Sequence, residues 1–125
     1  MAHSVLVVED EPHILLSLEV LLDKAGFDVR AAHDGDAALH EVAERPPNVM
    51  LLDVMLPKRD GYAVCEAVRS NPALDDVRIV MLTAKGRETD RERGLAAGAD
   101  EFITKPFSTR ELIQRMKAIV GTDAD

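Results

Sequence analysis

The chain has 125 residues, of which 46% are hydrophobic and 30% charged, and this composition is ordinary for one soluble globular domain. Its 23 acidic and 15 basic side chains give a formal net charge of −8, which argues against direct binding to nucleic acid, because that binding needs a basic face. The single cysteine excludes an internal disulfide, and the lack of a signal peptide and of an apolar run of roughly 18 residues predicts a cytoplasmic protein with no membrane contact.

Five short apolar runs are spaced along the chain, and they are rich in β-branched residues and too short for helices. They are Val5–Val8, Val29–Ala32, Val49–Leu52, Ile79–Leu82 and Phe102–Ile103. The first, third and fourth runs are apolar throughout, which is typical of strands buried on both faces of a parallel sheet.

Longer segments with apolar residues at helical spacing separate these runs. The first predicted helix begins at Pro12, which the first turn of a helix tolerates, and Gly26 can end it in a left-handed conformation. The second begins near Asp34–Asp36 and stops before Pro46–Pro47. Apolar residues carry the helical spacing in these two segments: Ile14, Leu15, Leu18, Leu21, Leu22, Ala25, Ala38, Leu39, Val42 and Ala43.

The third predicted helix runs from about Tyr62 to Ser70, and the last begins at Ser108, which forms a capping-box pair with Glu111. The residues that these helices are expected to bury are Val64, Cys65, Val68, Leu112, Ile113, Met116, Ile119 and Val120. Between them lies Gly86–Gly98, a mostly charged segment with little apolar surface beyond Leu95, Ala96 and Ala97. A helix with so little to bury should be the least stable element, and it is either simply solvated or left loose because it moves.

Strand and helix thus alternate five times. This order predicts an α/β fold, a doubly wound sandwich of five parallel strands with right-handed crossovers. We expect residues 1–125 to form a single domain that ends in a short polar tail, Gly121–Asp125.

Polar side chains follow several of the predicted strands. In open α/β sheets ligands bind beyond the carboxyl ends of the strands, so these residues should meet at one edge. They are Glu9, Asp10 and Glu11 after the first strand, Asp53 after the third, Thr83 at the end of the fourth and Lys105 after the fifth. Each alone has an ordinary explanation as a helix cap, turn residue or solvated side chain, and only their joint placement favours a functional site.

Carboxylates crowded at one edge repel one another and raise one another's pKa values unless a cation neutralises them. A ligand set made only of oxygen suits Mg²⁺ better than a transition metal, and the four histidines are scattered along the chain. A metal, a lysine and a hydroxyl also meet the needs of a phosphoryl group in transfer, and a carboxylate can serve as the nucleophile that forms an acyl phosphate.

Four segments together resemble the response-regulator receiver family. They are Val7–Pro12 (VVEDEP), Leu51–Pro57 (LLDVMLP), Met81–Ala84 (MLTA) and Gly98–Phe107 (GADEFITKPF), and the likeness extends from about Ser4 to Val120. Their order and spacing are closest in style to receivers of the winged-helix response regulators. The resemblance implies a flavodoxin-like fold with strand order 2-1-3-4-5, an order also found in chemotaxis receivers.

The resemblance also implies the role of each acid. Asp53 aligns with the residue that accepts a phosphoryl group in two-component phosphorelay signalling. Asp10 aligns with a direct Mg²⁺ ligand, Glu9 with an acid that acts through a metal-bound water, and the backbone carbonyl of Met55 with a further ligand.

Three other residues are implied to handle the phosphoryl group and the response to it. Lys105 aligns with the lysine that pairs with the phosphoryl oxygens, and the Lys105–Pro106 bond is typically cis in such domains. Thr83 aligns with the switch hydroxyl and Phe102 with the aromatic residue that changes rotamer. Phosphorylation would then repack the surface formed by the fourth helix, the fifth strand and the last helix.

Two positions depart from the chemotaxis-type receivers, in which the corresponding residues influence attack of water on the acyl phosphate. Met55 is apolar and Lys85 is basic. An apolar side chain cannot orient that water, so we expect slow self-dephosphorylation.

The resemblance implies a signalling switch in a bacterial cytoplasm rather than an enzyme. Its partners would be a sensor histidine kinase or a histidine phosphotransfer protein, and a downstream protein or a second copy bound through the fourth helix, fifth strand and last helix. Charged residues on that surface would mediate the pairing: Arg87, Arg91, Arg93, Asp100, Glu101, Arg110, Arg115 and Lys117.

Other classes of protein fit the sequence less well. Haloacid-dehalogenase-like phosphatases place a second aspartate where this chain has Met55, and a receiver-like fold kept only for protein contacts would not need the full set of acids. Histidine phosphotransfer proteins, which could use His13 or His40, are four-helix bundles. The chain is expected to be a complete single-domain regulator, with a piece of a longer transcriptional regulator as the alternative.

Overall fold

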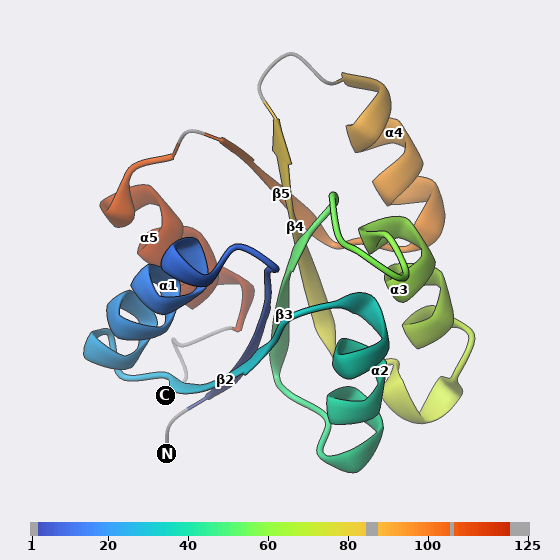
Figure 1. Cartoon of the computed structure of the whole chain (residues 1–125), viewed down its shortest axis with the longest axis horizontal. Coiled ribbons are helices and arrows are strands. Elements are labelled where there is room, and N and C mark those ends of the chain that lie inside the picture. The colour runs from blue at the N-terminus through green and yellow to red at the C-terminus, as the bar shows by residue number, and fades with distance from the viewer. Residues whose placement is uncertain (1–2, 85–87, 106, 121–125) are drawn as a thin grey trace.

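The computed structural model of the chain describes residues 3–84, 88–105 and 107–120. Its centre is a sheet of five parallel strands in the order β2-β1-β3-β4-β5 (Figure 1). The strands are β1 (Ser4–Val8), β2 (Asp28–Ala32), β3 (Val49–Asp53), β4 (Arg78–Ala84) and β5 (Glu101–Lys105). The flavodoxin-like fold and its strand order are therefore confirmed.

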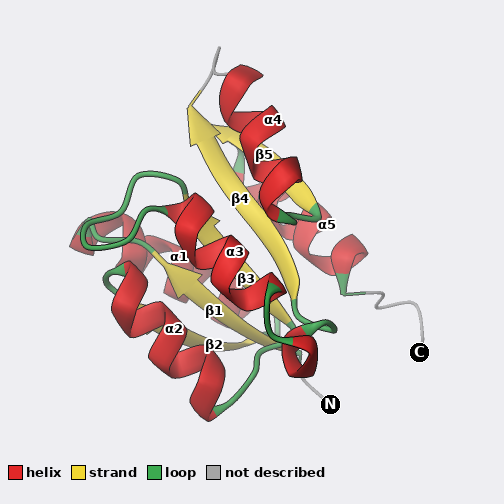
Figure 2. Cartoon of the chain, turned by 90° about the vertical axis from the view of Figure 1, so that its right-hand side faces the viewer, coloured by secondary structure: helices red, strands yellow, loops and turns green. Residues whose placement is uncertain are grey.

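Helices cover both faces of the sheet (Figures 1 and 2). One face carries α1 (Pro12–Lys24) and α5 (Thr109–Ile119), and the other carries α2 (Gly35–Glu44), α3 (Gly61–Arg69) and α4 (Glu88–Ala97). A short 3₁₀ turn, Pro72–Leu74, links α3 to β4. The sheet excludes a four-helix bundle, and both histidines that such a protein could have used, His13 and His40, are exposed.

Two apolar cores lie on either side of the sheet, because side chains alternate between its faces along each strand. Along β1, Val5 and Val7 pack toward α1 and α5, whereas Leu6 and Val8 pack toward α2 and α3. All residues of β3 are buried, as the unbroken apolar runs predicted. The central strands are consequently fixed from both faces, which holds their carboxyl ends in place.

Side chains at the helix starts stabilise the predicted boundaries. Asp34 and Ser108 accept hydrogen bonds from the Ala37 and Glu111 amides at 2.8 and 3.0 Å, and so cap α2 and α5. Gly26 follows α1 with a φ of 98°, in the left-handed conformation expected of it.

Several residues that carry helical periodicity differ from expectation in their burial. Ile14 and Ala43 are exposed, and Ile113, Ile119 and Val120 are only partly buried, because the helices present a narrower stripe to the sheet than their apolar content suggests. In α4 the exposed fraction of Leu95 is 53%, and the residues that pack inward are Gly94 and Ala97. The first residues of the predicted fourth helix, including Gly86, lie outside the described residues.

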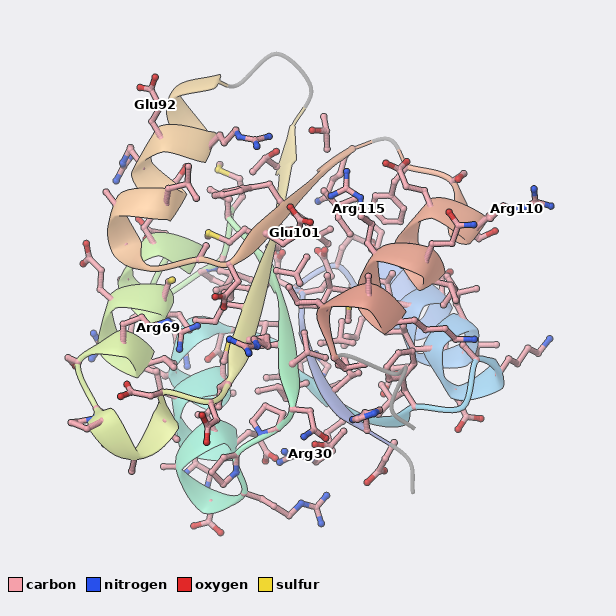
Figure 3. All side chains as sticks on the ribbon, turned by 180° about the vertical axis from the view of Figure 1, so that it is seen from behind. Arg30, Arg69, Glu92, Glu101, Arg110 and Arg115 are labelled. Carbon is pink, nitrogen blue, oxygen red and sulfur yellow. The ribbon has the colours of Figure 1, made fainter. Side chains whose placement is uncertain are left out.

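Arg69 joins the end of α3 to the turn before β5 (Figure 3). Its guanidinium donates to the carbonyl oxygens of Gly98 at 2.9 Å and Val77 at 2.7 Å, and to Asp100 Oδ2 at 2.7 Å. Asp100 Oδ2 also accepts from the Ile79 amide at 2.8 Å. This network ties β5, which leads to Lys105, to the neighbouring strand.

Arg69→Lys should therefore lower the free energy of unfolding by about 1–3 kcal/mol, because an ammonium group cannot serve the same acceptors as the guanidinium fork. Urea unfolding followed by circular dichroism measures the change. Arg78→Lys, at an exposed position, is the matched control and should have little effect. Equal effects of the two substitutions would contradict the role of the network.

Candidate functional site

Three carboxylates meet at the carboxyl edge of the sheet. Glu9 and Asp10 follow β1, and Asp53 is the last residue of β3, the strand that pairs with β1 in parallel register. Glu9, Asp10 and Asp53 each offer one oxygen, and these atoms all lie within 4.8 Å of one another. The structure thus brings together Glu9, Asp10 and Asp53. Glu11, which the sequence also placed at this edge, is not part of the cluster, because its side chain caps α1 by accepting from the His13 and Ile14 amides at 2.7 and 3.0 Å.

The cluster has a buried floor and an open rim. The exposed fraction is 2% for Glu9 and 5% for Asp53, whereas Asp10 is exposed to solvent. The side on which Asp10 lies is therefore open to solvent and to a small ligand.

Lys105 provides the positive charge of the site. Its Nζ lies 3.2 Å from Asp53 Oδ2 and 3.9 Å from Glu9 Oε1. The other Asp53 oxygen, Oδ1, accepts a hydrogen bond from the Met55 amide at 3.2 Å, and Glu9 Oε2 accepts one from the Glu11 amide at 3.2 Å. Within the part of the chain that the structure describes, one lysine faces these three carboxylates, so negative charge is in excess among them when all are ionised.

The pKa of Glu9 is raised to about 7, and burial is the largest cause. The neighbouring Asp53 carboxylate also raises it, while the Glu11 amide and the charge of Lys105 act in the opposite direction. At neutral pH the protein without a bound cation is thus close to the point at which it takes up a proton at Glu9.

The cluster fits a hard divalent cation. Glu9 Oε1 is buried and has no hydrogen-bond partner among the described residues, which is an unfavourable state for a carboxylate oxygen. The donors are all oxygens, and Asp10 leaves one side open to water, as Mg²⁺ prefers. Glu9, Asp10 and Asp53 are the side chains that would hold it.

Thr83 and Phe102 lie on the far side of Asp53 from the acids of β1. Thr83 is buried, one residue beyond Leu82, which pairs with Asp53 between β3 and β4. Phe102 is also buried and packs so closely on α4 that a Cβ at Gly94 would lie 2.4 Å from its ring. The hydroxyl therefore lies near the acidic edge, whereas the ring lies beneath α4.

Other residues of interest fall outside this picture or were not anticipated. Lys85 and Pro106 lie outside the described residues. Gly61 was not singled out from the sequence, although a Cβ there would lie 2.5 Å from the Asp53 carbonyl oxygen. Its position directly after Asp60, which caps α3, was the only signal that could have pointed to it.

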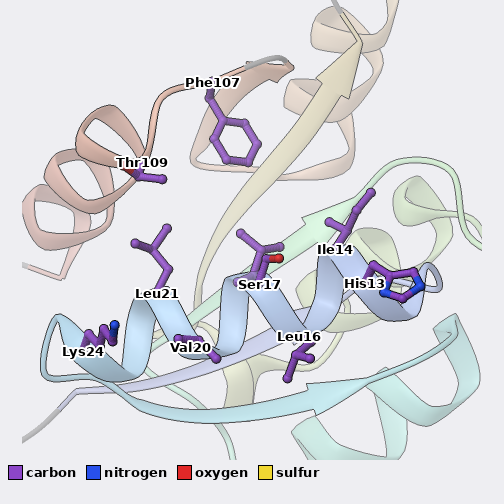
Figure 4. Close-up of a pocket in the computed structure, with 10 residues that line it drawn as sticks. His13, Ile14, Leu16, Ser17, Val20, Leu21, Lys24, Phe107 and Thr109 are labelled. Carbon is purple, nitrogen blue, oxygen red and sulfur yellow. The ribbon is translucent and has the colours of Figure 1, made fainter.

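An apolar groove of about 700 Å³ lies beside the cluster but contains none of its acids. In Figure 4, Ile14, Ser17 and Leu21 point from α1 toward Phe107 and Thr109, whereas Leu16 and Val20 point toward β2. None of the described helices is long and apolar enough to cross a membrane.

Comparison with known proteins places the chain among receivers. The family model for the response regulator receiver domain matches residues 5–117. A response regulator structure from Chloroflexus aurantiacus is 38% identical, with a TM-score of 0.92, and the alignment covers 96% of this chain and 98% of that one.

Two further structures with the same fold come from a sensor histidine kinase and from a longer protein. The receiver domain of a sensor histidine kinase from Pseudomonas aeruginosa, with a magnesium ion in its active-site cleft, is 30% identical over 97% of this chain and 99% of that one, with a TM-score of 0.89. NtrX from Brucella abortus is 30% identical with a TM-score of 0.88, and the match covers 98% of this chain but 28% of that one.

Without metal, the protein should lose stability as the pH rises from about 4.5 to about 7, because the folded state keeps a proton on Glu9 that the unfolded chain releases. Glu9→Gln carries no titrating group there, so its free energy of unfolding should fall less over this range. Urea unfolding in a chelator at several pH values measures the difference, with the exposed Glu44→Gln as control. Parallel pH profiles for Glu9→Gln and the parent would contradict this assignment.

Proposed function

This chain belongs to the response regulator receiver domain family, and we propose that it is a phosphorylation switch whose acceptor is Asp53. Receiver domains act in two-component signalling as switches rather than as classical enzymes. The observation that carries the proposal is the position of the buried Asp53 carboxylate, 3.2 Å from Lys105 Nζ and within one acidic cluster with Glu9 and Asp10.

Mg²⁺ is the cofactor in this proposal. Asp10, Asp53 and the backbone carbonyl of Met55 would hold it directly, and Glu9 would act through a bound water. When bound, the cation would neutralise negative charge on the cluster and on the phosphoryl oxygens. The orphaned Glu9 oxygen supports this arrangement.

In the transfer step, a carboxylate oxygen of Asp53 forms a bond to phosphorus while the bond from phosphorus to a histidine nitrogen of the donor breaks. The leaving imidazole keeps the electron pair of the broken bond and, with a proton on its other ring nitrogen, departs as a neutral base. Lys105, already within reach of Asp53, would pair with the transferred oxygens. The Lys105–Pro106 peptide bond is proposed to be cis, as in similar domains.

The response would pass through Thr83 and Phe102. A phosphoryl group on Asp53 would attract the Thr83 hydroxyl, and the space that Thr83 leaves would admit the Phe102 ring. The close packing of Phe102 on Gly94 supports a coupling to α4, since the ring lies directly against that helix. The switched surface would comprise α4, β5 and α5, and it would bind a downstream protein or a second copy.

Charged residues on this surface are partly engaged within the chain (Figure 3). Glu101 pairs with Arg115 at 3.2 Å, and Arg93 lies 4.1 Å from the centre of the Tyr62 ring. Arg110 is exposed, and Arg87 lies outside the described residues. Pairing between copies through Glu101 or Arg115 would therefore have to replace contacts that already exist.

The phosphoryl donor is proposed to be a sensor histidine kinase or a histidine phosphotransfer protein in the cytoplasm. The donor would approach Asp53 from the solvent-exposed side of the cluster, where Asp10 lies. The apolar groove begins at His13, close to that side, and offers such a protein additional surface.

We propose that residues 1–125 form one receiver domain, with residues 121–125 as a polar tail. We also propose that the chain belongs to the winged-helix response-regulator subfamily, because the order and spacing of its four receiver motifs are closest to those of that subfamily. Similar receivers also occur within longer chains, since the match to NtrX covers 28% of that protein. The alternative proposal is therefore that this chain is the receiver part of a larger transcriptional regulator.

Incubation with Mg²⁺ and a small acyl phosphate should add one phosphoryl group to the parent protein and none to Asp53→Ala, because only the carboxylate can form the acyl phosphate. Intact-mass spectrometry measures the addition. Asp60→Ala, which removes an acid that caps α3, is the matched control and should still be labelled. Addition to both the parent and Asp53→Ala would exclude Asp53 as the acceptor.

The phosphorylated protein should lose its phosphoryl group slowly, because Met55 is apolar, 69% exposed and unable to orient an attacking water. Met55→Asn, which offers an amide in the same place, should shorten the lifetime about tenfold or more, and Lys85 is proposed to contribute to the same property. Decay of the added mass after removal of the donor measures it. Loss from the parent within seconds would contradict the prediction.

A further inference from the structure

The loop that joins β3 to α3, residues 54–60, starts at Asp53 and returns to it (Figure 1). Its return is fixed by the Gly61 amide, which donates to the Val54 carbonyl oxygen at 2.9 Å. Val54 is buried in the core, whereas Met55 next to it is largely exposed. The loop therefore has a fixed base directly behind the Asp53 carboxylate.

The tip of the same loop rests on the start of α2. Lys58 Nζ lies 3.7 Å from Asp34 Oδ2, and Arg59 Nε lies 2.7 Å from Asp36 Oδ1. Both cations are more than half exposed. Exposed ion pairs contribute little in water, so these pairs alone do not fix how closely the loop approaches the helix.

Gly35, the first residue of α2, allows the close approach. A Cβ there would lie 2.5 Å from the Arg59 carbonyl oxygen and 2.6 Å from the Arg59 Cβ. Gly35 is not among the glycines with positive φ, which are Gly26 and Gly98, so the site needs glycine for space and not for backbone conformation.

We propose that Gly35 is a positioning residue for the Asp53 site: its missing side chain lets the β3–α3 loop lean on α2 and so sets where the loop backbone beside Asp53 lies. The inference rests on the proposed function, in which the Met55 carbonyl is a ligand of Mg²⁺. A Cβ must lie at least 3.0 Å from a carbonyl oxygen, whereas a Cβ at Gly35 would lie 2.5 Å from that of Arg59. A methyl group at Gly35 would therefore move the loop or the helix by at least 0.5 Å. In metal sites the distance from metal to ligand lies within about 0.2 Å of its usual value, so a shift of this size carried along the loop to Met55 would be large.

A displaced loop should weaken Mg²⁺ binding without unfolding the domain. The start of α2 cannot easily yield, because Asp34 caps the helix through the Ala37 amide at 2.8 Å and Gly35 itself is buried. The loop has an exposed side at Met55 and can yield more readily. Alanine is also the better helix former, so any loss on substitution arises from the contact with Arg59.

The matched control is Gly26→Ala. Gly26 has a φ of 98° and no atom within 4 Å of the added Cβ, so this substitution strains the backbone without crowding a neighbour. Gly26 follows α1 and leads into β2, at the opposite end of the strands from Asp53. The control thus separates a general loss of stability from an effect on the site.

Titration calorimetry of Mg²⁺ into the metal-free parent, Gly35→Ala and Gly26→Ala tests the inference. Gly35→Ala should raise the Kd for Mg²⁺ about tenfold, and Gly26→Ala should lower the thermal midpoint but leave the Kd within about twofold. The Mg²⁺ concentration for half-maximal labelling by an acyl phosphate should shift equally, while the rate at saturating Mg²⁺ stays within about threefold of the parent.

The outcomes are distinguishable. A parent that binds no Mg²⁺ would contradict the proposed function itself, whereas equal Kd values in the parent and Gly35→Ala, or equal shifts in both glycine variants, would contradict only the role of Gly35. If Gly35→Ala does not fold, Gly35→Ala combined with Arg59→Gly removes one of the two crowded atoms and keeps the carbonyl clash. Its Kd should still exceed that of Arg59→Gly alone, and equality would overturn the inference.

Discussion

Repulsion between carboxylates at one edge of the sheet is the constraint on which the rest of the structure depends. Glu9 and Asp53 are almost completely buried, Asp10 lies beside them, and Lys105 supplies positive charge within ion-pair distance. Burying ionised carboxylates is unfavourable unless they are paired, so the fold holds this edge in a state that a cation would relieve. The raised pKa of Glu9 is the direct expression of that state.

Apolar packing provides the stability that such an edge requires. The strands that carry the acids, β1 and β3, lie at the centre of the sheet and are buried on both faces. Their pairing in parallel register brings Glu9 close to Asp53. Because interiors are closely packed, the carboxylates cannot move apart without disturbing both cores.

The helices on the two faces of the sheet differ in how much apolar surface they bury. α1 and α5 bury several large apolar side chains, whereas the buried residues of α4, where its burial is described, are the small residues Gly94 and Ala97. Close contacts at glycine connect the site to its surroundings: Gly61 meets the Asp53 backbone, Gly35 meets the loop, and Gly94 meets the Phe102 ring. A structural change at Asp53 can thus be transmitted through these close contacts, and α4, which buries little apolar surface, can shift to accommodate it.

The sequence alone determined the alternation of strands and helices, the start of α2, the capping of α5, and the set of acids at the strand ends. Each of these depends on local periodicity or on the position of a residue next to a strand or helix end. The sequence did not determine that Ile14 is exposed or that Gly35 and Gly61 touch the loop at Asp53. Those facts depend on how far two elements approach each other in space. A glycine carries no side chain whose pattern could announce such an approach, so only the tertiary structure decides it.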